Sequence, residues 1–236
     1  MSTLKEIIDN SRYAVFFGGA GVSTASNIPD FRGANGIYNT ENEWGLPPER
    51  IISHSFFVRR TKDFYDYYKK YMVYPDARPN EVHTALARLE KEGKIKAVLT
   101  QNIDGLHQKA GSKNVLELHG SVFRNYCTRC GRFFDLDYVL SGKGVPVCDC
   151  GGVIKPDVVL YEEPLDGETW GKAFEEIEKA DTLIVGGSSL NVYPAAGLVD
   201  SFSGKNLCII NASKTPYDRR ATYLSHENLL TEFKNL

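Results

Sequence analysis

The stretch that decides the fold lies near the N-terminus, where residues 14–33 read AVFFGGAGVSTASNIPDFRG. Tyr13 to Phe17 is an apolar block without polar alternation, which is typical of a strand covered on both faces in a parallel sheet. Three glycines follow directly, at Gly18, Gly19 and Gly21. They allow the backbone to come close to a ligand, and residues 22–27 can begin a short helix whose free amides would bind a phosphate. The stretch therefore predicts a central strand, a phosphate-binding turn and a helix.

The composition excludes several classes of protein. The chain has 236 residues, a net charge of −2 and 25% charged residues of both signs. That length suits one large domain, or one domain with a small insert. The balanced charge indicates neither nucleic acid nor an anionic membrane as a partner. Residues 1–6 carry acids and a helical pattern instead of a signal peptide, and no apolar run is long enough to span a membrane, so we expect a cytoplasmic protein.

Strand and helix patterns alternate along the chain with short connections. Further strands are expected at 95–100, 115–118, 158–161, 182–186 and 207–211, and helices at 4–10, 80–93, 169–179 and 194–202. Residues 56–72 carry aromatic side chains at helical spacing, which we interpret mainly as core, and residues 33–50 form a long loop of the kind that often acts as a lid. This alternation predicts an α/β fold with a doubly wound parallel sheet and helices on both faces.

Four of the five cysteines form two close pairs. Cys127 and Cys130 are spaced C-x-x-C, Cys148 and Cys150 are spaced C-x-C, and seventeen residues separate the pairs. Two thiolate pairs on glycine-rich turns predict a closed, structural zinc site. The alternatives are four unrelated buried cysteines or a free-standing zinc ribbon for nucleic acid, and the absence of a basic patch counts against the second. Cys208 lies in an apolar strand and is expected to be a small core residue.

Polar runs follow three of the expected strands, where ligands bind in open α/β sheets. Residues 100–107 read TQNIDGLH, residues 117–121 read ELHGS, and residues 186–196 read GGSSLNVYPAA. Amide and carboxylate groups of the first run could bind a nicotinamide carboxamide, although Asp104 could equally cap a helix. His119 could be a proton acceptor or a packed side chain. The residues alone leave these alternatives open, and a generic glycine-rich loop would also explain the first turn.

Taken together, these runs resemble the sirtuins, the NAD-dependent protein-lysine deacylases. The similarity begins with GAGVS at residues 19–23 and IPDFRG at 28–33, continues through 100–107, 117–121 and 186–196, and keeps the order of the family motifs to the C-terminus. The family inserts a four-cysteine zinc ribbon at this point of the chain. The resemblance thus implies a Rossmann-like domain of residues 1–122 and 154–236, with the cofactor loop and a helical insert in 33–78, and a small zinc domain of residues 123–153.

The resemblance also implies a set of site residues. His119 matches the general base, with Asn102 as the second catalytic residue, and His107 is expected to be structural. The zinc ligands would be Cys127, Cys130, Cys148 and Cys150. The NAD-binding residues would be Gly19, Ala20, Gly21, Ser23, Thr24, Asp30, Phe31, Arg32, Gln101, Asn102, Ile103, Asp104, Gly187, Ser188, Ser189 and Asn211.

The implied substrate is an acetylated lysine in an extended peptide. In the family, the segment matching residues 155–164 lines the acyl-lysine tunnel and pairs with the peptide as an added strand. The expected contacts are Val159, Tyr161, Glu162, Asn191 and Val192. Where sirtuins have F-G-E, this chain has Tyr161-Glu162-Glu163, so the glycine is missing and the shape of the tunnel mouth and the sequence preference are open.

The acyl group is expected to be neutral. Members that prefer acidic acyl groups carry Tyr-x-x-Arg, whereas the matching place here has Tyr65 and Tyr68, and a tyrosine lacks the bidentate fork of an arginine. The implied reaction releases nicotinamide, and His119 deprotonates a ribose hydroxyl on the way to O-acetyl-ADP-ribose. The alternatives are a protein mono-ADP-ribosyltransferase, an NAD-binding module without turnover and, less well supported, a dehydrogenase. We expect a monomer.

Overall fold

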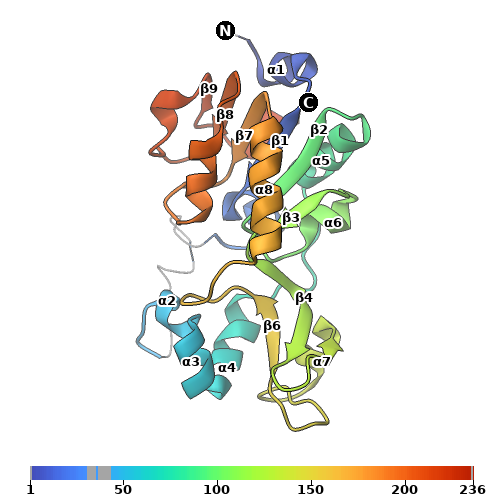
Figure 1. Ribbon diagram of the computed structural model, residues 1–236, viewed down its shortest axis with the longest axis vertical. Coiled ribbons are helices and arrows are strands. Elements are labelled where there is room, and N and C mark those ends of the chain that lie inside the picture. The colour runs from blue at the N-terminus through green and yellow to red at the C-terminus, as the bar shows by residue number, and fades with distance from the viewer. Residues whose placement is uncertain (1, 31–35, 37–43, 235) are drawn as a thin grey trace.

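The computed structural model describes residues 2–30, 36, 44–234 and 236, and they form two lobes stacked along the long axis (Figure 1). The larger lobe contains a six-stranded sheet, in the order β3-β2-β1-β7-β8-β9, in which all neighbouring strands are parallel. Its strands are β1 (Ala14–Gly18), β2 (Ile95–Thr100), β3 (Val115–Glu117), β7 (Thr182–Gly186), β8 (Asn206–Ile210) and β9 (Tyr223–Ser225).

The first strand is buried on both faces, as its apolar block predicts. Val15 and Phe17 belong to the core beneath α8 (Gly167–Lys179) and the 3₁₀ helix η4 (Ala195–Ser201). Phe16 points to the opposite core, which is covered by α1 (Leu4–Asn10), α5 (Glu81–Lys91) and α9 (Leu229–Phe233). Alternate side chains of a strand enter opposite faces, so an unbroken apolar run requires helices on both sides. The doubly wound prediction is confirmed.

The strand order places the end of β1 at a topological switch point. From β1 the chain builds β2 and β3 on one side, and later builds β7 against the other side of β1. The loops after β1 and β7 therefore leave the sheet in diverging directions. In open α/β sheets this divergence creates the crevice in which ligands bind.

The smaller lobe combines an antiparallel sheet with helices from a different part of the chain. Tyr65, Tyr68, Phe134 and Ile154 lie in one buried cluster, so the expected aromatic core of residues 56–72 packs against the cysteine-containing sheet. The sheet order is β5-β4-β6. The elements are α2 (Pro48–Ile51), α3 (His54–Arg59), α4 (Thr61–Tyr71), β4 (Gly120–Cys127), β5 (Phe133–Phe134), α7 (Leu136–Ser141) and β6 (Ile154–Val158).

One expected strand is wrong. The apolar run at 158–161 is not part of the parallel sheet, because the strand there is β6, which ends at Val158 and pairs with β4. Beyond it, the Val159 N–H donates to the His119 carbonyl at 3.0 Å, and the Tyr161 N–H donates to the Ile52 carbonyl at 3.1 Å. Apolar residues here line a cavity instead of a sheet interior, a distinction that hydrophobicity alone does not make.

Two of the expected helices are present as 3₁₀ helices. Residues 20–26 form two short 3₁₀ turns, η1 (Ala20–Val22) and η2 (Thr24–Ser26), and residues 195–201 form η4. Serine, threonine and glycine are poor helix formers, and Asn27 closes the second turn at φ 61°. The expected short helix after the glycines is therefore formed by two tighter turns, and the phosphate site there stays a prediction. The remaining elements are α6 (Leu106–Ala110) and η5 (Asp218–Arg220).

The antiparallel sheet spans residues 120–158, and the domain boundaries at 122/123 and 153/154 stay a prediction. Of the expected lid, the structure describes Gly36 and residues 44–50. Cys208 is fully buried in β8, as expected for a core residue, and burial raises its pKa to about 12. No helix in the described ranges combines the length and apolar character needed to cross a bilayer.

Candidate active site

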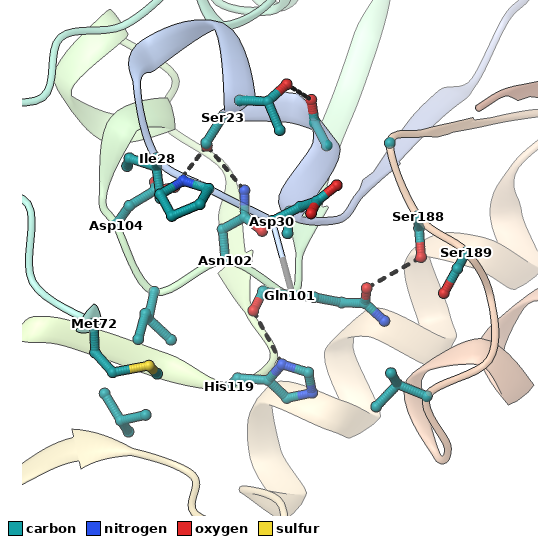
Figure 2. Close-up of a pocket in the computed structure, with 18 of the residues that line it drawn as sticks. Ser23, Ile28, Asp30, Met72, Gln101, Asn102, Asp104, His119, Ser188 and Ser189 are labelled. Carbon is teal, nitrogen blue, oxygen red and sulfur yellow. Dashed lines mark hydrogen bonds between the residues drawn. The ribbon is translucent and has the colours of Figure 1, made fainter. Parts of the chain in front are cut away.

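A cavity of about 870 Å³ lies at the carboxyl ends of β1, β2 and β7 and is lined by residues of both lobes. Figure 2 shows His119 in this cavity, with Met72 on one side and Ser188 and Ser189 on the other. The lining includes most of the expected NAD-binding residues: Ala20, Gly21, Ser23, Thr24, Asp30, Gln101, Asn102, Ile103, Asp104, Gly187, Ser188, Ser189 and Asn211. Gly19 is not in the lining, and Phe31 and Arg32 lie outside the described residues.

The two glycine turns pack directly on each other. The Gly21 N–H donates to the Gly187 carbonyl at 2.9 Å. A Cβ on Gly187, where φ is +60°, would lie 2.6 Å from the Gly21 carbonyl carbon, and a Cβ on Gly21 would lie 2.7 Å from Gly187 Cα. These two glycines are therefore required for contact between two backbones, a role that the sequence analysis did not anticipate. Their contact brings the loops after β1 and β7 to one edge of the cavity.

A chain of hydrogen bonds joins the first glycine turn to the loop after β2. Asn102 Nδ2 donates to Ser23 Oγ at 3.0 Å, and Ser23 Oγ donates to Asp104 Oδ2 at 2.6 Å (Figure 2). Asp104 Oδ1 also accepts from the Leu106 N–H at 2.9 Å, at the start of the helix Leu106–Ala110. The N-cap residue of that helix is Gly105, so the expected N-cap at Asp104 is wrong by one position. Burial raises the pKa of Asp104, against the opposing effect of these two donors. The chain fixes the side chains of Ser23 and Asn102 at the cavity wall.

The tautomer of His119 follows from its hydrogen-bond partner. Nδ1 lies 3.0 Å from the backbone carbonyl of Gln101, and a carbonyl only accepts, so Nδ1 carries the proton. Nε2 therefore holds the lone pair. Burial lowers the pKa of His119, partly offset by the bond to Gln101, which keeps the ring neutral near pH 7. A neutral imidazole with a free Nε2 is the form that can accept a proton.

The side chain of Gln101 offers the cavity an unused donor. Its Oε1 accepts from Ser188 Oγ at 3.1 Å, which links β2 to the second glycine turn. Its Nε2 is buried and has no partner in the part of the chain that the structure describes. Buried polar atoms are nearly always hydrogen-bonded, and leaving one unpaired costs about 1–3 kcal/mol. This orphaned donor fits a bound molecule that presents an oxygen.

The expected substrate residues are placed unequally. Val159, Tyr161, Glu162 and Val192 line the cavity, whereas Asn191 is exposed and is not in the lining. Tyr65 and Tyr68 do not reach the cavity, because they are buried in the core of the smaller lobe. At the positions where some family members bind an acidic acyl group, this chain therefore has two uncharged core residues that do not line the cavity.

Sequence reasoning missed two parts of the lining. One is an apolar wall from the smaller lobe, and the other is a polar edge after β8 and β9. No motif marks the apolar wall, because apolar residues in helices and strands have the same pattern as core residues. Part of the polar edge directly follows Asn211 in the sequence, and that position could have indicated it. The missed residues include Ile52, Met72, Val122, Leu136, Ala212, Ser213, Glu227 and Asn228.

The four paired cysteines form one cluster. Their Sγ atoms all lie within 4.8 Å of one another, and the Cys127–Cys150 and Cys130–Cys148 distances are 3.4 and 3.7 Å. A tetrahedral zinc with Zn–S bonds of about 2.3 Å places its sulfurs about 3.8 Å apart, so the cluster fits this ion. With four thiolates no coordination position is left open, and the ion would be structural. Zinc would join the hairpin after β4 to the segment before β6.

Comparisons with known proteins show which family the chain resembles. The model of the family described as "Sir2 family" matches residues 19–194. An "NAD-dependent protein deacetylase" of Clostridium tetani (strain Massachusetts / E88) is 58% identical over 96% of this chain and 92% of its own. A Sir2 structure with a deacetylated p53 peptide and 3'-O-acetyl-ADP-ribose has a TM-score of 0.88 and 39% identity, over 99% of this chain and 96% of that one.

A second solved structure, of Sir2 with a p53 peptide and NAD+, has a TM-score of 0.86 and 38% identity. It covers 100% of this chain and 97% of its own. The family match spans the first glycine turn, the residues after β2 and β3, the four cysteines and the second glycine turn. The chain therefore belongs to the Sir2 family.

Proposed function

We propose that this protein removes acetyl groups from protein lysines at the expense of NAD, releasing nicotinamide and O-acetyl-ADP-ribose. Relatives of this length and similarity are named NAD-dependent protein deacetylases, and similar solved structures hold a peptide with NAD+ or with the acetyl-ADP-ribose product. The observation that carries the proposal is the neutral His119 in a cavity shared with both glycine turns, its Nδ1 bound to the Gln101 carbonyl and its Nε2 unprotonated.

The residues present fit NAD. The contacting glycine turns, with Ala20, Ser188 and Asn211, would hold the diphosphate and adenosine ends, and the orphaned Gln101 Nε2 would donate to the nicotinamide ribose or carboxamide. When bound, NAD supplies a ribose carbon from which nicotinamide can leave. Zinc would be held by the four cysteine thiolates and would take no part in the chemistry.

His119 and Asn102 carry the chemical roles in this proposal. His119 Nε2 accepts the proton of a ribose hydroxyl, and the Gln101 carbonyl holds the ring in the tautomer that this step needs. Asn102 is fixed by its bond to Ser23 and orients the reacting groups. Most of the acceleration should come from this orientation in a partly closed site.

The acetylated lysine would enter along residues 159–162 and Val192, which line the cavity on the side of the smaller lobe. An extended peptide can bind there by adding as a strand. A neutral acyl group needs no arginine partner, which agrees with the buried tyrosines Tyr65 and Tyr68 at the place where acid-preferring members carry Tyr-x-x-Arg. A monomeric state and a cytoplasmic location complete the proposal as predictions.

The decisive assay measures nicotinamide release from NAD with and without an acetylated peptide, with the peptide mass read at the same time. Loss of an acetyl mass supports deacetylation, whereas gain of ADP-ribose supports the transferase alternative, and no release at all contradicts both. His119→Asn keeps a donor for the Gln101 carbonyl but has no basic nitrogen, so it should fold normally and lose about 10²–10⁴-fold in turnover. Near wild-type turnover in His119→Asn and His119→Ala would show that another group is the base.

A further inference from the structure

The segment that lines the cavity after β6 is bonded directly to the start of α3. The His54 N–H donates to the Tyr161 carbonyl at 2.9 Å, and the Ser55 N–H donates to Glu162 Oε2 at 2.9 Å. The Ser55 hydroxyl donates to the same carboxylate, at 2.8 Å to Oε1 and 2.6 Å to Oε2. Residues 53 and 161 also form an isolated parallel bridge. The cavity wall is thus tied to the helical part of the smaller lobe.

Glu162 has an unusual backbone conformation for these contacts. Its φ of +76° lies in the left-handed region, which costs a residue with a Cβ about 1 kcal/mol relative to glycine. The sirtuin pattern has glycine at this place, and glycine would adopt the conformation freely. Here the hydrogen bonds from Ser55 offset the cost, and they also lower the pKa of Glu162. The chain has replaced a flexible position by a bonded one.

The next residue is also held. Glu163 accepts from the Leu160 N–H at 2.9 Å and from Lys155 Nζ at 3.0 Å, and its Oε1 lies 2.8 Å from His54 Nδ1. Glu163 keeps the identity of the family motif, so its bonds alone do not distinguish this chain. Glu163 holds one end of the turn and backbone bonds hold Tyr161 at the other, so the Glu162–Ser55 contact adds the side-chain bonds that fix the residue between them.

We propose that Glu162 is a positioning residue for the acetylated peptide, which fixes residues 159–162 against Ser55 so that the strand that receives the peptide is formed before the peptide binds. This inference rests on the proposed function. Ordering a segment in advance removes part of the entropy that binding otherwise costs. The effect is specific to the peptide, because Glu162 lies on the side of the cavity formed with the smaller lobe, away from the glycine turns that would hold NAD.

The test compares Glu162→Gly, Glu162→Gln and Ser55→Ala in the full chain. Glu162→Gly removes the carboxylate and releases the backbone, so KM for the acetylated peptide should rise about tenfold, while kcat and KM for NAD stay within twofold. Glu162→Gln keeps an acceptor for the Ser55 N–H and should raise peptide KM about threefold. The double variant Ser55→Ala/Glu162→Gly should have the same peptide KM as Glu162→Gly alone, because the two substitutions remove the same contact.

A peptide KM within twofold of wild type in Glu162→Gly, or an equal rise of both KM values, would overturn the inference. Binding of a fluorescent acetylated peptide, read by anisotropy, gives a second measure that needs no turnover. If wild type shows no peptide-dependent nicotinamide release, the proposed function fails; an active enzyme indifferent to Glu162→Gly rejects the positioning role alone. Thermal unfolding of each variant shows whether the fold is retained. If the Glu162 variants do not fold, Ser55→Ala alone tests the inference: peptide KM should rise about threefold, and an unchanged KM would reject the positioning role.

Discussion

Gly187→Ala should destabilise the protein more than an ordinary glycine substitution, because Gly187 lies against another backbone. An added Cβ would stand 2.6 Å from the Gly21 carbonyl carbon, 2.6 Å from the Val22 nitrogen and 2.8 Å from Gly21 Cα. No side chain can move away to relieve these overlaps. The left-handed φ of +60° costs alanine about 1 kcal/mol, and forcing packed groups apart costs about 1–3 kcal/mol more. We therefore expect a loss of about 2–4 kcal/mol in unfolding free energy.

Gly93→Ala is the matched control for this experiment. Gly93 has a similar φ of +74°, but the nearest atom to its added Cβ is Lys96 Nζ at 4.0 Å. Only the conformational cost of about 1 kcal/mol should remain there. Urea unfolding followed by circular dichroism gives both free energies, provided that the slopes agree. The reasoning is refuted if Gly187→Ala loses no more stability than Gly93→Ala, or keeps wild-type KM for NAD, because the two turns form the edge of the cavity.

Three further predictions concern other parts of the molecule. Removing zinc with a chelator, or changing Cys148 to serine, should lower the thermal midpoint and the metal content, because Cys127 and Cys148 are buried in the core of the smaller lobe. His83 and His107 are buried beside each other, and burial lowers their pKa values to about 4 and about 3. Below pH 6.5 the unfolded chain therefore binds more protons than the folded one, so the stability that these neutral histidines contribute is fully present above that pH. The free energy of unfolding should fall by about 2 kcal/mol per histidine between pH 6.5 and 5, as measured by urea midpoints. The loss over this pH range should be smaller in His107→Phe, which has one titrating histidine fewer. Asn80 Nδ2 donates to the Val22 carbonyl at 2.8 Å while its Oδ1 caps α5 by accepting from the Val82 N–H at 2.9 Å. Asn80→Asp keeps the cap and loses the donor, so KM for NAD should rise about tenfold with little change in thermal midpoint; unchanged KM would contradict this role.

The role of His119 was predictable in part from the sequence. A histidine at the end of an expected strand, next to Gly120, could be a base or a packed side chain, and the resemblance to the sirtuins favoured the base. Its place in the cavity with Ala20, Asn102 and Ser188 agrees with that interpretation. Its tautomer could not be read from the sequence, because the Gln101 carbonyl that fixes it lies in the loop after β2.

The sequence by itself determined the central strand, the parallel α/β architecture and the pairing of four cysteines whose cluster fits zinc. Each depends on residues close together in the chain: an apolar block with no polar alternation, the spacing between turns, or two cysteines on one tight loop. Such patterns depend on local backbone geometry and on burial, and neither depends on which distant segment packs against the residues.

Only the tertiary structure decided which apolar residues line the cavity, why Gly21 and Gly187 must both be glycine, and how Glu162 holds a left-handed turn. The run at 158–161 looked like a sheet strand because hydrophobicity reports burial without naming the neighbour that causes it. Gly21 and Gly187 meet because the strand order brings β7 beside β1, and Glu162 meets Ser55 because the smaller lobe joins distant segments. Contacts between residues far apart in the chain follow from topology, which no local pattern contains.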